Sequence, residues 1–234
     1  MIPNRFRIAL VAVACLLCVL FAYAGPKDFW EAKPYTDWSA KEVEKILLKN
    51  SPWTHTYLPN IPSSGASIGS TSSGGGSRGG GGSQGGSQII INWYSRPIRE
   101  AVVRQIMLNR PDAPKAQQDQ ILNHKTEYLE LLLTGYSLGG GRSRGGGGGE
   151  DPMERFKKDT FIQKKDNTRI PLVNVIAPRS AGSAMTLQFA KEVDGKPAIT
   201  AEDKEVTLQI RFGENLFKFK FKMADMMVRG ELAI

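Results

Sequence analysis

The residues best placed for chemistry are a serine flanked by glycines, Gly135-Tyr136-Ser137-Leu138-Gly139, directly after an apolar run. This Gly-x-Ser-x-Gly spacing resembles the nucleophile elbow of lipases, in which a strand leads through a tight turn into a helix. Such an enzyme needs a histidine base later in the chain than its serine. The only histidines, His55 and His124, both precede Ser137. The residue order argues against Ser137 as a nucleophile, and we predict no catalytic residue.

Glycine-rich tracts explain the motif as a product of composition. Of the 25 glycines, 11 lie in residues 65–86 and 8 in residues 139–149. The same spacing recurs four times more in these tracts, beginning at Gly65, Gly75, Gly81 and Gly141. The tracts mix glycine with serine, arginine and glutamine, and without apolar periodicity they cannot bury enough surface to order themselves. We predict a flexible linker over residues 63–88 and a disordered loop insertion over residues 139–149.

The arginines of the tracts, Arg78, Arg142 and Arg144, also give a resemblance to arginine–glycine boxes that bind RNA. Such segments repeat their arginines and interleave aromatic side chains on which bases stack. Three arginines without an aromatic neutralise few phosphates, and salt-sensitive affinity scales with that number. We therefore predict no nucleic-acid partner.

Metal ligands and cofactor motifs are equally sparse. Two distant histidines match no zinc spacing, and the acidic group Glu202, Asp203 and Glu205 lacks the alternating spacing of a calcium loop. We interpret that group as a solvated turn and the histidines as surface or helix-end residues. The sequence predicts no metal and no cofactor.

The first 24 residues have the pattern of a secretory signal peptide. Two arginines precede an apolar run over residues 8–21, which is shorter than the roughly 20 residues of a membrane-spanning helix. Small residues then mark a cleavage site, formed by Ala22, Ala24 and Gly25. Two alternatives stay open: an uncleaved N-terminal anchor, and a lipoprotein processed at Cys15. We predict a secreted or periplasmic protein whose mature form does not span the membrane.

Both cysteines, Cys15 and Cys18, lie inside this segment, so the mature chain has no disulfide and must rely on an apolar core. The formal net charge is +8 at pH 7. This excess is spread along the chain, which suits a solvated surface or attraction to anionic envelope polymers.

Residues 25–62 contain one well-marked helix. Ser39 is a suitable N-cap, Glu42 completes a capping box, and Trp38 can pack on Val43 as a hydrophobic staple. One helix cannot bury its apolar stripe alone. We therefore expect the segment to dock on the later domain, with Trp38 and Trp53 as the docking aromatics.

Residues 89–234 are predicted to form one α+β domain. An apolar β-branched run at 89–94 predicts a strand, Ser95 and Pro97 open a helix, and a weaker helix extends from Asp112 to about His124. A strand follows at 127–134, with Leu129, Leu131 and Leu133 on one face. Alternation beyond the second tract predicts further strands at about 160–165, 172–177, 184–191, 204–212, 217–223 and 227–234.

The clearest hairpin joins 204–212 to 217–223, and its outward face is basic. Placing apolar opposite apolar pairs Phe212 with Phe217, which predicts a four-residue loop, Gly213 to Leu216. The other face then carries Arg211, Lys218, Lys220 and Lys222. We expect either lysines that keep an edge strand soluble or an anion-binding stripe.

Three stretches, residues 33–53, 91–102 and 199–232, resemble an uncharacterised group of secreted soil-bacterial proteins. The resemblance implies export and a shared architecture, and it carries no assigned activity or site residue.

Together these features predict an α+β fold. It has an antiparallel-rich sheet packed by two or three helices, a C-terminal β-meander in which the final four strands take part, and long Gly/Ser-rich loops. For function, they predict a non-catalytic exported bacterial envelope protein that binds an envelope protein or polymer or serves as a structural component. One alternative is a hydrolase of an extracellular polymer that works through carboxylates not recognisable in sequence. A second is a polyanion-binding protein that uses the basic strand face.

Overall fold

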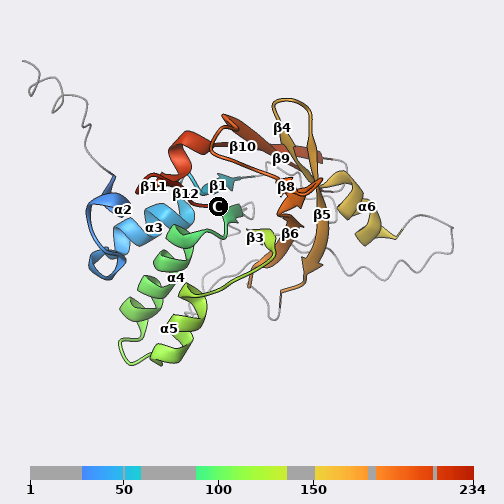
Figure 1. The fold of residues 1–234 in the computed structure, drawn as a ribbon. Helices are drawn as coiled ribbons and strands as arrows, with labels where there is room; N and C mark the ends of the chain where they lie inside the picture. The colour runs from blue at the N-terminus through green and yellow to red at the C-terminus, as the bar shows by residue number, and fades with distance from the viewer. Residues whose placement is uncertain (1–27, 50, 59–87, 136–150, 179–182, 213–214) are drawn as a thin grey trace, which may run out of the picture.

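The computed structural model describes residues 28–49, 51–58, 88–135, 151–178, 183–212 and 215–234. Eight strands form one antiparallel sheet in the order β1-β2-β3-β6-β5-β4-β9-β10 (Figure 1). Their bounds are β1 Thr54–Tyr57, β2 Ile89–Trp93, β3 Tyr128–Thr134, β4 Phe161–Lys164, β5 Arg169–Ile176, β6 Met185–Ala190, β9 Glu205–Phe212 and β10 Asn215–Lys222. The predicted α+β class is confirmed.

The sheet curls until its two edge strands, β1 and β10, face each other, so that it is nearly a closed barrel. The rings of Tyr57 and Phe217 lie 4.9 Å apart, and those of His55 and Phe221 lie 4.7 Å apart. Among the described strands, no backbone pairing joins β1 to β10. Side chains therefore close this seam.

The core fills the inside of the curled sheet. Residues directly opposite each other on paired strands point to the same face. Ile170, Ile162, Leu208 and Phe219 are such register partners across β5, β4, β9 and β10, and all four are buried. Leu129, Leu131 and Leu133 of β3 are buried together, as the sequence predicts.

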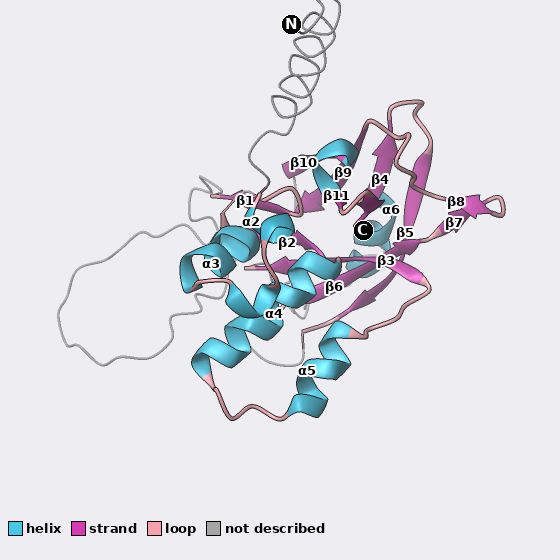
Figure 2. Cartoon of the chain, turned by 60° about the vertical axis from the view of Figure 1, so that its left-hand side comes forward, coloured by secondary structure: helices cyan, strands magenta, loops and turns pink. Residues whose placement is uncertain are grey.

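Five α-helices lie around the described part of the sheet. Their bounds are α2 Phe29–Ala32, α3 Ala40–Leu48, α4 Arg96–Asn109, α5 Lys115–Leu122 and α6 Pro152–Asp159. Figure 2 shows α3, α4 and α5 gathered on one side of the molecule, and Figure 1 shows α6 beside β5 on the opposite side.

Helix α3 begins with the predicted capping box. Ser39 accepts from the Glu42 backbone N–H, and the Glu42 carboxylate accepts from the Ser39 N–H at 2.8 Å. A side-chain hydrogen bond from Lys33, followed by those from Ser39, lowers the pKa of Glu42 to about 2 against the cost of burial. The N-terminus of α3 is thereby fixed.

The other end of α3 is attached to the sheet by polar side chains. The Ile46 carbonyl accepts from Ser51 and Thr54, and the Leu47 carbonyl accepts from Asn92 of β2 at 3.0 Å. The last carbonyls of a helix have no partner inside the helix. Strands β1 and β2 supply those partners, so the helix is held against the outer face of both strands.

Strand β1 and helix α6 are among the elements that the sequence patterns did not predict. Strand β1 is short and mostly polar, and its place is set by β2, with which Tyr57 pairs at Ile89. Helix α6 is opened by Asp151, whose side chain accepts from the Met153 N–H at 3.1 Å, with Pro152 in the first turn. That pair of residues is a recognisable helix start.

The predicted register of the last hairpin is wrong by two residues. Phe212 lies opposite Asn215, not Phe217, and Phe217 lies opposite Ile210. Only residues 213–214 separate the strands. At the other three inward pairs an apolar residue still faces an apolar one, because a shift of two residues preserves the face on which every side chain lies.

Strands β4, β5 and β6 are consecutive neighbours and form the meander, while β9 pairs with β4 instead of β6. The meander therefore begins earlier in the chain than the final four predicted strands.

The C-terminal stretch is a 3-10 helix, Met223–Met226, followed by the small hairpin β11–β12 (Met227–Val228 and Glu231–Leu232). A second small hairpin joins β7 (Glu192–Val193) to β8 (Lys196–Pro197).

Several predictions concern residues outside the described ranges. They are the signal peptide over residues 1–24, with Ala22, Ala24 and Gly25, the motif serine Ser137, the insertion 139–149 and all of the linker 63–88 except Gln88.

Candidate anion-binding face

Lysines occupy alternate positions in the second half of β10, at 218, 220 and 222. Phe219 and Phe221 turn into the core, which places Lys218, Lys220 and Lys222 on the outside, and all three are exposed. The predicted basic residues of this strand therefore share one solvent-facing side.

The observed register gives these lysines different partners from those predicted. Gln209 lies opposite Lys218, Thr207 opposite Lys220 and Glu205 opposite Lys222, so that no two cations are directly opposed. The predicted register, with Phe212 opposite Phe217, would have placed Arg211 opposite Lys218, and this pairing does not occur. The two-residue shift removes the like-charge repulsion that the predicted register would have imposed.

Two of the four predicted cations are engaged in ion pairs. Arg211 Nε lies 3.0 Å from the Asp159 carboxylate of α6, and Lys220 Nζ lies 3.3 Å from Glu205. Within the described residues, Lys218 and Lys222 form no ion pair with a carboxylate. These two charges remain available to an anion.

The same outward side continues across four strands. Pro171 of β5 pairs with Phe161 of β4, Phe161 with Gln209 of β9, and Gln209 with Lys218 of β10. Phe161 is itself buried, so this line is not exposed to solvent along its whole length. At about 4.8 Å per strand, this line spans roughly 14 Å. A second line runs beside it, through Arg169, Gln163, Thr207 and Lys220. We name this surface the outer basic face, after its cations Arg169, Arg211, Lys218, Lys220 and Lys222.

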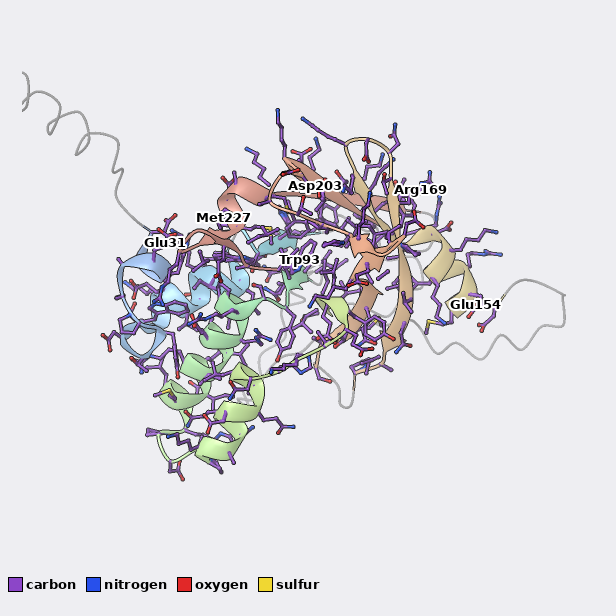
Figure 3. All side chains as sticks on the ribbon, in the orientation of Figure 1. Glu31, Trp93, Glu154, Arg169, Asp203 and Met227 are labelled. Carbon is purple, nitrogen blue, oxygen red and sulfur yellow. The ribbon has the colours of Figure 1, made fainter. Side chains whose placement is uncertain are left out.

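At the α6 end of the outer basic face lies a cleft of about 520 Å³. Figure 3 labels Glu154 on α6 and Arg169 on β5 at this side of the molecule. The Arg169 guanidinium lies 4.4 Å from the centre of the Phe161 ring, which holds the cation at the cleft. The cleft is lined by Glu154, Lys157, Lys158, Thr160, Phe161, Arg169, Pro171, Leu172 and Val173.

A smaller cleft of about 330 Å³ gathers the acidic residues of the β4–β5 turn and the segment before β9. Asp203 accepts from the Thr200 N–H at 2.8 Å and pairs with Lys164 at 2.8 Å. Hydrogen bonds from Thr168 lower the pKa of Asp166. A catalytic acid needs a raised pKa. The contacts of Asp203 fit the predicted turn, and Asp166 stabilises the β4–β5 turn in the same way by accepting from the Thr168 backbone N–H at 2.9 Å.

A histidine–carboxylate pair lies at β3, where sequence reasoning did not place one. His124 Nε2 is 2.8 Å from the Glu130 carboxylate, whose side chain is only 6% exposed. Gln188 donates to the other Glu130 oxygen at 2.8 Å, and Asn174 donates to Gln188 at 3.0 Å. Burial, opposed by the charge of nearby Arg99, raises the pKa of Tyr94, whose ring is 5.4 Å from that of His124. The two residues are only six positions apart, but that spacing matches no catalytic or metal-binding motif.

His55 lies in the edge strand β1 at the seam and is partly exposed, so of its two predicted settings the surface one fits and the helix-end one does not. Its ring contacts Phe221, and its Nε2 lies 2.7 Å from the Lys220 carbonyl oxygen. Burial lowers the pKa of His55, and the hydrogen bond to Lys220 opposes part of that effect.

Trp38 and Trp53 are both fully buried in the common core. The Trp53 ring packs edge-on against Trp30 at 5.5 Å, and its Nε1 donates to the Ala233 carbonyl at 2.9 Å. Trp38 packs against Phe29 at 5.6 Å. The structure thus places both side chains between the N-terminal segment and the rest of the fold.

Comparisons with protein-family models, with curated proteins and with solved structures found no match to the chain.

Across the described ranges, no helix combines the length and the apolar character needed to cross a membrane. In the same ranges, no three His, Cys, Asp or Glu side chains come together as a metal-binding group.

Proposed function

We propose that this chain is an exported bacterial envelope protein that works by binding, without catalysis, and that the outer basic face binds an anionic polymer of the envelope. The signal-like pattern of residues 1–24 supports export. The resemblance of residues 33–53, 91–102 and 199–232 to secreted soil-bacterial proteins supports the same compartment.

The observation that carries the binding proposal is the row of lysines on β10. Lys218, Lys220 and Lys222 project from one side of an edge strand, and Glu205 neutralises only one of them. Lysines also protect edge strands from pairing with other chains. Protection alone does not account for Arg169, which belongs to β5, well inside the sheet, and lies on the same outward side.

Binding is tested by the salt needed to elute the exported protein from immobilised heparin. Replacing Lys218, Lys220 and Lys222 by glutamine should lower that salt concentration, because affinity for a polyanion depends on the number of charges neutralised. The matched control replaces three exposed lysines of α3, α5 and the following loop, Lys41, Lys115 and Lys125. Equal elution of the two triple variants would overturn the proposal.

Export is tested separately by N-terminal sequencing of protein recovered outside the cytoplasm. Cleavage after Ala24 gives Gly25 as the first residue. A chain that retains Met1, or one that begins at Cys15, contradicts the proposed processing.

A second candidate function, hydrolysis of an extracellular polymer, is favoured by the pair of His124 and Glu130. A buried carboxylate that accepts from an imidazole orients the ring and stabilises its protonated form, as in acid–base catalysis. Turnover of a polysaccharide or ester substrate that disappears in Glu130→Gln would establish this candidate. Turnover unchanged by that substitution, or no turnover, rejects it.

A further inference from the structure

We propose that the cleft between α6 and strands β4 and β5 is a subsite for a sugar ring, which makes the outer basic face selective for an acidic polysaccharide. The inference rests on the proposed binding function and adds the chemical class of the polymer. Three features of the surface carry it: an apolar floor, cations at the two ends and a neutral polar middle.

The floor of the cleft offers apolar surface to one face of a ring. Pro171 and Val173 are exposed, Val173 to 44%, and Phe161 lies beneath Arg169. The register shifts between Leu172 and Asn174, so Val173 is the extra residue of an irregularity in β5. Such irregularities redirect side chains next to functional sites. The C–H face of a sugar ring can pack on a surface of this kind.

Cations border this floor. Arg169 forms no ion pair with a described carboxylate, and its planar guanidinium can bind a carboxylate through two parallel hydrogen bonds. Lys157 also lines the cleft, and Glu154, the acidic residue of the lining, lies 3.2 Å from Lys157 Nζ. A sugar acid seated on Pro171 and Val173 would therefore present its carboxylate to Arg169.

Neutral polar side chains separate the cleft from the lysines of β10. Gln163, Thr207 and Gln209 point outward between Arg169 at one end and Lys218 and Lys220 at the other. Amide and hydroxyl groups donate to and accept from sugar hydroxyls. An unbroken row of cations would bind any flexible polyanion and would not favour an acidic polysaccharide. Alternating charge and neutral hydrogen-bonding groups suits a chain whose carboxylates are separated by hydroxyl-bearing rings.

Thr160 adds a buried polar group to the lining. Its Oγ1 has no hydrogen-bond partner among the described residues. Buried polar atoms without partners are rare in folded proteins. A ligand hydroxyl entering the base of the cleft would supply one.

The test compares two polyanions of equal charge number, an oligogalacturonate and a poly-glutamate, in calorimetric titrations of the exported protein. The oligogalacturonate should bind about tenfold more tightly, because poly-glutamate has carboxylates but no ring that packs on Pro171 and Val173 and so holds a carboxylate against Arg169. Arg169→Gln should remove that preference, whereas Arg110→Gln, at an exposed position on the α4 side, should leave it unchanged. Val173→Glu, which blocks the floor with a like charge, should also remove it.

The outcomes separate the two proposals. Equal affinity for both polyanions, or a preference that survives in Arg169→Gln and Val173→Glu, overturns the sugar subsite and leaves the binding face intact. Binding of neither polyanion overturns the subsite together with the proposed function. Replacement of the three β10 lysines by glutamine should weaken both polyanions by a similar factor.

Discussion

His55 Nε2 lies 2.7 Å from the carbonyl oxygen of Lys220, and this contact joins the two edge strands of the sheet. A carbonyl only accepts, so the imidazole donates through Nε2 and the ring is fixed in that tautomer. Phe219 and Phe221 flank the ring at 6.0 and 4.7 Å. The barrel-like sheet is thus closed by one imidazole and its aromatic neighbours, where a complete barrel would have a ladder of backbone hydrogen bonds.

Stability should fall on acidification because of this histidine. Burial lowers the pKa of His55 in the folded state below its ordinary value of 6.5. The unfolded chain therefore binds more protons as pH falls below that value, and the free energy of unfolding decreases. Urea unfolding between about pH 8 and pH 5.5 should show this slope, and His55→Gln should flatten it.

His124→Gln serves as the comparison, since the other histidine lies away from the seam. Parallel stability curves for the wild type and His55→Gln across this range would contradict the assignment of the slope to the seam.

Gly135 and Gly230 should differ sharply in their tolerance of alanine, although both have positive φ, +82° and +84°. A Cβ at Gly135 would lie 1.9 Å from the Gln88 carbonyl oxygen, whereas one at Gly230 meets nothing within 4 Å. Gly230→Ala should cost about 1–2 kcal/mol, the cost of a left-handed conformation. Gly135→Ala should cost about 4 kcal/mol or more, because the backbone of β2 must move. Chemical denaturation of both variants measures the difference, and similar losses would refute the close approach.

Trp53 should couple energetically to the C-terminus. Its indole N–H donates to Ala233 at 2.9 Å, a contact between residues 180 positions apart. Trp53→Phe should cost about 1–3 kcal/mol, because it reduces a buried side chain and removes the donor to Ala233. Deletion of residues 233–234 removes the acceptor, so Trp53→Phe should cost less in that background. A double-mutant cycle with no coupling would show that the hydrogen bond does not contribute.

Sequence rules succeeded where the cause is local. Ser39 and Glu42 lie three residues apart in one turn, so their reciprocal hydrogen bonds depend on little else. The inward face of β3 was predictable because Leu129, Leu131 and Leu133 alternate with other residues, and this pattern requires only that one face of the strand is buried. The start of α6 at Asp151 and Pro152 is equally local, since the Asp151 side chain caps the helix that Pro152 begins.

Sequence patterns did not predict features for which several arrangements satisfy the same pattern, such as the register of a hairpin. Alternation repeats every two residues, so it cannot distinguish Phe212 opposite Phe217 from Phe212 opposite Asn215. The charges do distinguish them, because the observed register places Glu205 opposite Lys222 and separates Arg211 from Lys218. The contact of Gln188 with Glu130, and the cleft beside Arg169, depend on the order of strands in the sheet, which no local spacing encodes.

The pairing of Tyr57 with Ile89 brings together two points of the chain that are separated by residues 58–88. Whatever connects them must leave and return at neighbouring positions on one edge of the fold. Loop-closure entropy grows only with the logarithm of loop length, by about 0.6 kcal/mol per doubling. This edge is therefore a natural insertion point, at which a reporter or an affinity module could replace the connection while the sheet keeps its register.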